Sequence, residues 1–285
     1  MPGPYRAEAM DDELGIWSDE SGPLDAPLIV LIHGSMDRST GMLRLSRRLD
    51  SAFRVLRYDR RGYGKSAPDD EPHPGPFDMA AQVDDLVALL AGRKAVLVGH
   101  SYGGNVALAT AAQHPEQIAG VAVYETPLSW EPWWPGTTAG AAARATTGDA
   151  ADAAERFMRR LVSDAVWEGL PERTKATRRR EGSAMVGELR DLHAHRPWEA
   201  AAVQCPVVLS YGEHGAPHHR KGMEHAHAEL PDSTLVVVSG ARHDAPMSRS
   251  DEFAGTIVDA IAIAAGAPWA AAALSRRSGR PAAEP

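Results

Sequence analysis

The chain has 285 residues, 44% of them hydrophobic and 24% charged, so it is long enough for one large globular domain with an insertion. Its net charge of −8 argues against nucleic acid as a main partner and offers no basic face to anionic membranes. With one cysteine, Cys205, it cannot form an intramolecular disulfide, and its acidic first 13 residues lack the apolar core of a signal peptide. We therefore expect a cytoplasmic protein without a membrane span.

Short apolar runs alternate with helical patterns along most of the chain. The expected strands are 14–17 (weakly marked), 27–32, 53–58, 95–98, 118–124, 207–211 and 234–238. Between them, helical patterns cover 40–49, 78–90, 105–113 and 218–230, and a last helix follows Ser250. This alternation predicts an α/β fold, with a mostly parallel central sheet flanked by helices. Ligands of such sheets bind at the carboxyl ends of the strands.

The stretch 95–104 has the most specific pattern in the chain. A buried strand leads into Gly99-His100-Ser101-Tyr102-Gly103, which fits Gly-x-Ser-x-Gly, and a helix follows. A serine on that tight turn points its hydroxyl out of the sheet, and the helix N-terminus favours negative charge beside it. The alternative is that Ser101 merely caps the helix.

A nucleophilic serine needs a base, and histidine suits that role because its pKa lies near neutrality. Of the 12 histidines, His243 is the best candidate, since it follows the last strand at the same sheet edge as Ser101. His33 also ends a strand, but we expect it to hold the backbone of its loop. The remaining histidines include a cluster that invites a metal interpretation: His214, His218, His219, His225 and His227. Because it lacks His-Glu-x-x-His and paired cysteines, we expect no metal site.

The base in turn needs a carboxylate that holds its ring in one tautomer. Glu125 and Glu213 both end strands between Ser101 and His243, and both keep the order nucleophile, acid, histidine. The residues alone leave the choice open, and Glu125 could instead serve only to hold its loop.

The regular alternation stops at Thr126. Prolines interrupt the next segment, three tryptophans (Trp130, Trp133 and Trp134) cluster there, and 138–192 reads as helices only. The tryptophans either line a substrate pocket or pack the insertion onto the main domain. The run Arg178-Arg179-Arg180 is expected to be a solvated helix face.

From about Leu28 to Ala265, the chain resembles the α/β-hydrolase-fold family. Four motifs in register carry the resemblance: His33-Gly34, 59–66 (Asp-Arg-Arg-Gly-Tyr-Gly-Lys-Ser), 99–104 and Gly240-Ala241-Arg242-His243. The resemblance implies that Ser101 is the nucleophile and His243 the base. It also implies an oxyanion hole from the backbone N–H groups of Ser35 and Tyr102.

The family resemblance implies that the insertion is a cap that shapes the pocket. We expect residues 1–125 and 199–274 to form the hydrolase core and 126–198 the helical cap. Residues 275–285 mix Arg, Gly, Pro and Ala, and this composition predicts a disordered tail. The expected substrate pocket consists of His33, Met36, Trp130, Trp133 and Trp134.

The chain departs from the family at the acid. Members usually carry an Asp shortly after the strand matching 207–211, but this chain has Gly215 there. Some members take the acid from the end of the preceding strand, where Glu125 stands, so Glu125 is the first choice and Glu213 the second.

The nucleophile type narrows the expected chemistry to acyl transfer, because relatives that open epoxides or displace halide use Asp at this position. We expect a serine hydrolase of a small carboxylic ester, thioester or lactone, acting on a small-molecule substrate without metal or organic cofactor. Carbon–carbon bond hydrolysis, amide or lactam hydrolysis and cofactor-free peroxidation remain open within the fold. From another class, a ligand-binding or sensor protein with little turnover is supported only by the glycine at the usual acid position. The sequence does not indicate the oligomeric state.

Overall fold

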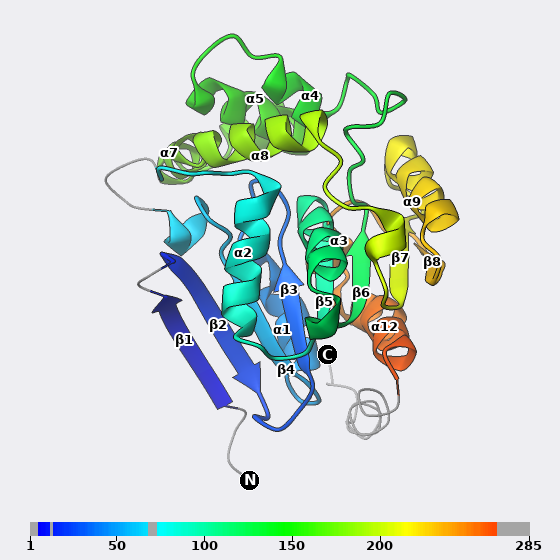
Figure 1. Cartoon of the computed structure of the whole chain (residues 1–285). Helices are drawn as coiled ribbons and strands as arrows, with labels where there is room; N and C mark the ends of the chain where they lie inside the picture. The colour runs from blue at the N-terminus through cyan, green and yellow to red at the C-terminus, as the bar shows by residue number, and fades with distance from the viewer. Residues whose placement is uncertain (1–4, 12–13, 68–72, 267–285) are drawn as a thin grey trace.

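A single eight-stranded sheet forms the centre of the molecule, and the strand order is β1-β2-β4-β3-β5-β6-β7-β8 (Figure 1). The computed structural model describes residues 5–11, 14–67 and 73–266. The strands are β1 (Tyr5–Asp11), β2 (Ile16–Gly22), β3 (Leu28–Ile32), β4 (Arg54–Tyr58), β5 (Ala95–His100), β6 (Ile118–Tyr124), β7 (Val207–Gly212) and β8 (Ser233–Val238). Strands β1 and β2 form an antiparallel hairpin that pairs antiparallel with β4, and the other neighbours are parallel.

The predicted α/β fold class is therefore confirmed. The structure adds an antiparallel hairpin at one edge of the sheet that was not fully predicted. The weakly marked strand around 14–17 begins at Ile16 and continues to Gly22, and β1 was not expected at all. In β2 the apolar pair Ile16-Trp17 is followed by four polar residues, 18–21, and β1 mixes polar and apolar residues, so the hairpin lacks the continuous apolar run that marks the inner strands.

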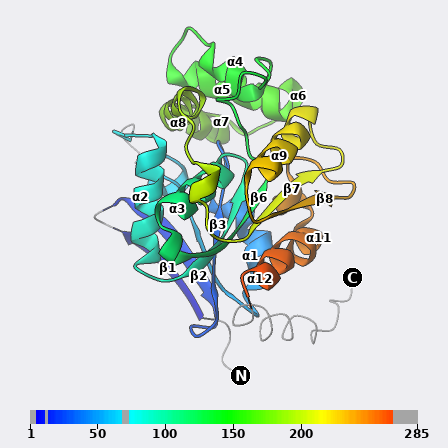
Figure 2. The ribbon, with the colours of Figure 1, turned by 45° about the vertical axis from the view of Figure 1, so that its right-hand side comes forward.

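Helices cover both faces of the sheet because its inner strands are apolar on both faces. In β3, Ile29 and Leu31 pack in one buried cluster, whereas Val30 and Ile32 pack in another on the opposite face. Figures 1 and 2 show α2 and α3 on one face and α1 and α12 on the other. The helices of the two layers are α1 (Leu43–Leu49), α2 (Met79–Leu90), α3 (Tyr102–Gln113), α9 (Pro217–Glu229), α10 (Ala245–Ser248), α11 (Ser250–Phe253) and α12 (Asp259–Ala264).

Five further helices lie above the carboxyl edge of the parallel strands (Figures 1 and 2). They are α4 (Ala139–Arg144), α5 (Ala150–Val162), α6 (Asp164–Glu168), α7 (Glu172–Arg180) and α8 (Gly182–Ala194). We call them the upper helices. A third buried cluster joins Trp167 and Met185 of the upper helices to Met36 and Tyr63 of the loops beneath. A buried ion pair between Arg60 and Glu188 of α8 crosses the same boundary.

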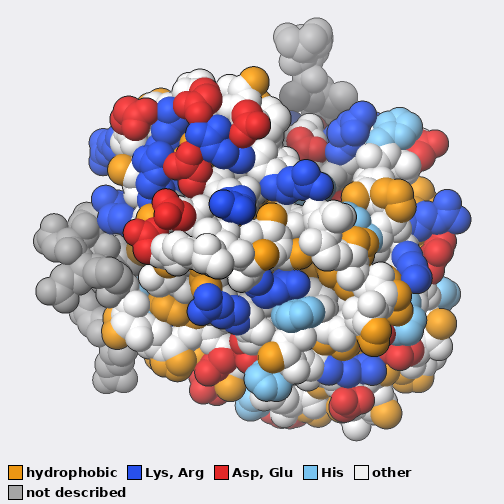
Figure 3. Space-filling view, turned by 90° about the horizontal axis from the view of Figure 1, so that it is seen from above, with side chains coloured by type: hydrophobic (Ala, Val, Ile, Leu, Met, Phe, Trp, Pro, Cys, Tyr) orange, Lys and Arg blue, Asp and Glu red, His pale blue; other side chains and the backbone are white. Residues whose placement is uncertain are grey.

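The surface of the upper helices carries acidic and basic side chains next to one another (Figure 3). Arg178 pairs with Glu181 at 3.1 Å and Arg179 pairs with Glu155 at 2.6 Å. Arg180 is exposed, as expected, whereas Arg178 and Arg179 are partly buried and their guanidinium groups bind carboxylates.

None of the helices in the described part of the chain has the length and apolar character to span a bilayer. The tail expected at 275–285 lies outside the described residues.

Candidate active site

Ser101 occupies a strained turn between β5 and α3. Its φ of 53° and ψ of −124° are unfavourable for a residue with a side chain. Close packing maintains the turn: a Cβ on Gly99 would stand 2.5 Å from the Gly103 carbonyl oxygen, and one on Gly34 would stand 2.9 Å from the Ser101 Cβ. The Ser101 side chain makes no capping hydrogen bond to α3, so the alternative role as a helix cap is wrong. Its side chain instead lines a cavity.

His243 is held beside this cavity by hydrogen bonds to its backbone. The His100 Nε2 donates to the His243 carbonyl oxygen at 2.8 Å, and the Tyr124 hydroxyl donates to the Arg242 carbonyl oxygen at 2.7 Å. Since a carbonyl oxygen only accepts, the His100 ring carries its proton on Nε2. His100 is adjacent to Ser101 in sequence, but its side chain holds the loop that carries His243.

Glu125 makes the carboxylate contact to this imidazole. Its Oε2 lies 2.7 Å from the His243 Nδ1, and its Oε1 accepts a hydrogen bond of 2.9 Å from the Gly212 N–H. The side chain is fully buried, and its backbone has a φ of 49°. A Cβ on Gly215 would overlap the Glu125 Oε1. The glycine at the usual acid position is therefore the residue type that leaves room for the Glu125 carboxylate.

Glu213, the second choice for the acid, binds elsewhere. Its carboxylate accepts hydrogen bonds from the Gly240 N–H at 2.7 Å and the Ser239 hydroxyl at 2.9 Å. The bond from the Gly240 N–H lowers the pKa of Glu213. Glu213 thus stabilises the loop that precedes His243, and no hydrogen bond or ion pair joins its carboxylate to the His243 ring.

The loop after β3 lies against Ser101 and is organised by His33. The His33 Nε2 accepts a hydrogen bond from the Arg60 N–H at 2.9 Å, so its Nδ1 carries the proton and donates to the Gly34 carbonyl oxygen at 2.8 Å. His33 is fully buried and holds the loop backbone, as predicted. Ser35, two residues after His33, lines the cavity. Tyr102 begins α3, where a backbone N–H has no carbonyl partner inside the helix.

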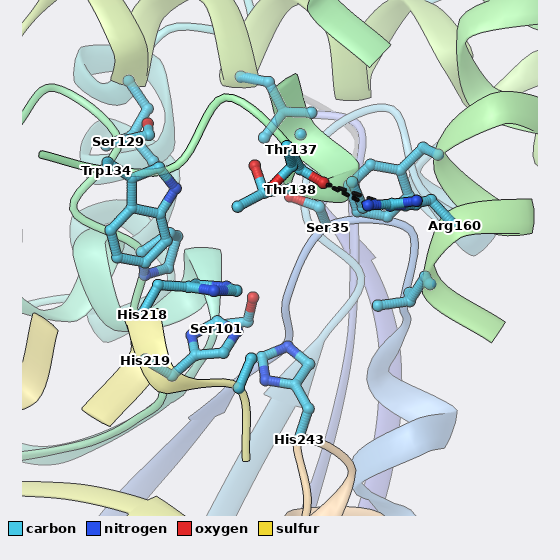
Figure 4. Close-up of a pocket in the computed structure, with 18 of the residues that line it drawn as sticks. Ser35, Ser101, Ser129, Trp134, Thr137, Thr138, Arg160, His218, His219 and His243 are labelled. Carbon is cyan, nitrogen blue, oxygen red and sulfur yellow. Dashed lines mark hydrogen bonds between the residues drawn. The ribbon is translucent and has the colours of Figure 1, made fainter. Parts of the chain in front are cut away.

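The cavity above Ser101 has a volume of about 380 Å³ and lies between the sheet edge and the upper helices (Figure 4). Its wall is formed by Ser35, Ser101, Pro127, Ser129, Trp134, Thr137, Thr138, Ala139, Gly140, Arg144, Phe157, Arg160, Leu161, Leu189, Leu192, Ala216, His218, His219 and His243. Figure 4 shows Trp134 and His218 on one side of the cavity and Arg160 on the other. Ten of these residues are Ser, Thr, Arg or His and the others are apolar or glycine, and a concave wall that combines apolar surface with convergent polar groups is typical of a small-molecule site.

The expected pocket residues need correction. Of the five, only Trp134 is among the residues that line this cavity. All three tryptophans pack against the main core, but Trp130 and Trp133 do not reach this cavity. His33 is fully buried below the loop, and Met36 belongs to the third buried cluster. Tertiary packing decides which of the loop tryptophans reaches the cavity, and the sequence has no periodic pattern that predicts this choice. Arg144 and Arg160 on the wall were missed because nothing in their spacing distinguishes them from the other arginines of the upper helices.

Three histidines gather beside Ser101, namely His218, His219 and His243 (Figure 4). The His219 ring stacks on the His243 ring at 4.6 Å between centroids, and the His218 ring lies 4.3 Å from that of His219. Ligand atoms of Glu125, His219 and His243 lie within 4.8 Å of one another, a spacing that a metal ion could use. An ion there would have to displace the 2.7 Å hydrogen bond between Glu125 and His243, so we keep the prediction of no metal site.

Buried histidines should make the stability of the protein pH-dependent. Burial lowers the pKa values of His33, His100 and His219 well below 6.5, so these rings stay neutral in the folded state while they protonate in the unfolded chain. As the pH falls below about 6.5, the unfolded chain therefore binds more protons than the folded protein, and the free energy of unfolding decreases. Each ring contributes a decrease of up to about 1.4 kcal/mol per pH unit, until the pH reaches the pKa of that ring in the folded state. Urea unfolding at pH 7.5 and 5.5 should show a lower midpoint at pH 5.5. An unchanged or higher midpoint would contradict this expectation.

Comparison with known proteins agrees with the fold. A model of the alpha/beta hydrolase family matches residues 29–256. The chain therefore belongs to the alpha/beta hydrolase family.

Curated relatives match over a shorter segment. The chain is 36% identical over 119 residues to the bifunctional esterase/perhydrolase DCH of Acinetobacter calcoaceticus, which covers 39% of this chain and 41% of that protein. It is 36% identical over 97 residues to the putative carbamate hydrolase RutD of Caulobacter sp. (strain K31), which covers 33% of this chain and 35% of that protein. It is 32% identical over 108 residues to epoxide hydrolase 4 of Mus musculus, which covers 38% of this chain and 30% of that protein. The matched segments thus span less than half of each of these relatives.

Solved structures match along most of the chain. A thermophilic esterase from Thermogutta terrifontis has a TM-score of 0.65 at 23% identity, with 88% of this chain and 96% of that chain covered. The enol-lactonase from Burkholderia xenovorans LB400 has a TM-score of 0.64 at 24% identity, with 87% and 97% covered. At these identities the similarity establishes the shared fold.

Proposed function

We propose that this chain is a serine hydrolase that cleaves a small carboxylic ester, or a thioester or lactone, through an acyl-enzyme on Ser101. The observation that carries the proposal is the 2.7 Å contact between the buried Glu125 carboxylate and the His243 Nδ1, beside a cavity that Ser101 also lines. Nucleophile, base and orienting acid are the three groups that acyl transfer to serine needs.

In this proposal the Ser101 Oγ attacks the substrate carbonyl while the His243 Nε2 takes its proton. Glu125 keeps the other ring proton on Nδ1 and stabilises the imidazolium that forms. The backbone N–H groups of Ser35 and Tyr102 stabilise the oxyanion. His243 then protonates the leaving alcohol or thiol, and finally activates the water that hydrolyses the acyl-enzyme. We further propose that the upper helices act as a cap that selects the substrate.

The alternative function, a ligand-binding protein with little turnover, loses its one argument. That argument was the glycine at the usual acid position, and Glu125 occupies the space which Gly215 leaves open. Hydrolysis of carbon–carbon or amide bonds would use the same three groups, so the choice among these reactions depends on the substrate.

Covalent labelling with a fluorophosphonate tests whether Ser101 is activated. We expect the wild-type protein to gain one probe adduct by intact mass, with peptide mapping placing it on Ser101. His243→Ala should label at least a hundredfold more slowly, because the serine loses its base. A folded wild-type protein that does not label would favour the ligand-binding alternative, and labelling that His243→Ala leaves unchanged would remove His243 from the proposed mechanism.

A further inference from the structure

The cavity has the opposite charge character to the protein as a whole. The chain carries a net charge of −8, yet the permanently charged residues on the cavity wall are two arginines, Arg144 and Arg160. The three histidines add no fixed positive charge, because burial lowers the pKa values of His218 and His219 and His243 pairs with the buried Glu125 carboxylate. Among the described residues that line this cavity, none is Asp, Glu or Lys. A concave site with low-dielectric walls and one sign of charge attracts ligands of the opposite sign.

Arg144 differs from the paired arginines of the upper helices. Arg159, Arg178 and Arg179 each bind a carboxylate of those helices. Arg144 is half-buried at the end of α4, and no described carboxylate pairs with it. Burial lowers the pKa of Arg144, and no neighbouring acid offsets that cost. The guanidinium has no protein anion beside it, so only water in the cavity solvates its exposed part, and the carboxylate of a ligand can replace that water.

The surroundings of Arg144 keep its guanidinium on the cavity wall. Its Nη1 would stand 3.6 Å from a Cβ built on Gly140, and Leu189 approaches the same point at 3.5 Å. The side chain therefore lies along the cavity-lining part of α4, beside an apolar residue of α8.

Arg160 adds a second positive charge at the exposed side of the cavity. Its Nε and Nη2 donate to the Thr137 carbonyl oxygen at 3.2 and 3.0 Å, as the dashed lines in Figure 4 show. These bonds hold the guanidinium at the wall but leave its charge uncompensated, because a carbonyl is neutral. Arg144, with all its donors free among the described residues, is the better partner for an anion.

We propose that the substrate of Ser101 carries a carboxylate that pairs with Arg144, so that this enzyme prefers acidic esters, such as half-esters of dicarboxylic acids. The inference rests on the proposed serine hydrolase function and names its substrate class. The planar guanidinium fork matches a carboxylate with two parallel hydrogen bonds. Apolar side chains on the same wall, Phe157, Leu161, Leu189 and Leu192, accommodate an alkyl chain between the ester carbonyl and the carboxylate.

A series of matched esters tests this preference. The acidic substrates are mono-p-nitrophenyl esters of succinate, glutarate, adipate and pimelate, so that the unknown span from Ser101 to Arg144 is covered. Each has a neutral counterpart in which an isopropyl group replaces the free carboxylate. For at least one chain length, wild-type kcat/KM should be about 10- to 100-fold higher for the acidic ester.

Arg144→Met should remove this preference, since it keeps the apolar stem but loses the charge. We expect kcat/KM for the acidic ester to fall about 10- to 100-fold, and that for its neutral counterpart to change less than threefold. The matched control is Arg173→Met, which removes an exposed charge from α7 away from the cavity and should leave both rates unchanged.

Binding to Ser101→Ala gives a readout that does not depend on turnover. Calorimetry should show that the best dicarboxylate of the series binds to Ser101→Ala and binds at least tenfold more weakly to Ser101→Ala/Arg144→Met. Inorganic phosphate that binds more tightly than every dicarboxylate, in an Arg144-dependent way, would overturn the carboxylate assignment. Equal rates for acidic and neutral esters, with neither class of anion bound, would overturn the inference while leaving the serine hydrolase in place. Absence of both hydrolysis and fluorophosphonate labelling would overturn the proposed function instead.

Discussion

Replacing Glu125 by Gln should lower the rate of acylation of Ser101 by about 10³- to 10⁴-fold without unfolding the protein. The structure indicates how the new amide would lie. The Gly212 N–H donates to the carboxylate Oε1, so the glutamine carbonyl would accept that bond and its NH₂ would face the His243 Nδ1. Nδ1 would then have to accept a hydrogen bond, and the ring proton would move to Nε2. An imidazole protonated on Nε2 cannot take the proton of Ser101.

Glu213→Gln is the matched control for this result. Glu213 stabilises the Ser239–Gly240 segment from an exposed position, so its replacement should change the acylation rate less than threefold. The measurement is the single-turnover rate of p-nitrophenol release from an activated ester. Equal losses in the two variants, or no loss in either, would contradict the assignment of Glu125.

A double variant can move the acid to the position that the family usually uses. Gly215→Asp alone should be inactive or destabilised, because its Cβ would overlap the Glu125 Oε1. Glu125→Gly removes that overlap and suits the φ of 49° at this residue, so Glu125→Gly/Gly215→Asp should recover at least tenfold of the acylation rate lost in Glu125→Gly. A double variant no faster than Glu125→Gly would mean that a carboxylate at 215 cannot reach His243.

Glu188→Ala should destabilise the folded protein by about 3–5 kcal/mol. Glu188 and Arg60 are both fully buried, with 2.6 Å between Oε2 and Nη1, and the Tyr63 hydroxyl donates to the Glu188 Oε1 at 2.6 Å. Removing the carboxylate leaves the Arg60 charge buried without its anion. Arg60 also donates to the carbonyl oxygens of His33 and Gly34, at 3.0 and 3.2 Å, so the loop next to Ser101 should loosen as well.

Urea unfolding measures this loss, and two further variants show its origin. Glu224→Ala breaks an exposed pair with Arg220 and should cost at most about 1 kcal/mol. Arg60→Met/Glu188→Leu removes both buried charges and should be more stable than Glu188→Ala, since no unpaired charge remains. A Glu188→Ala protein within about 1 kcal/mol of wild type would show that water or a rearranged side chain compensates Arg60.

Local patterns in the sequence determined much of the fold and the position of the proposed nucleophile. Apolar runs bounded by turn residues marked β3 to β8, because inner strands of a parallel sheet are buried on both faces. The turn at Ser101 was predictable because its glycines, its strand and its helix are contiguous in the chain. The edge hairpin was largely missed, since neither β1 nor β2 has the continuous apolar run of the inner strands.

Only the tertiary structure distinguished the two candidate acids. Glu125 and Glu213 both end strands, and the distinction depends on which carboxylate meets His243 after β6, β7 and β8 pair side by side. The space left by Gly215 and the Gly212 N–H are contributed from about 90 residues further along the chain, so no local pattern around Glu125 records them. The same reason applies to the cavity wall. Long-range packing places Trp134 and Arg144 on the cavity wall, whereas Trp130 and Trp133 contact the same core as Trp134 without reaching the cavity, and such packing has no sequence period.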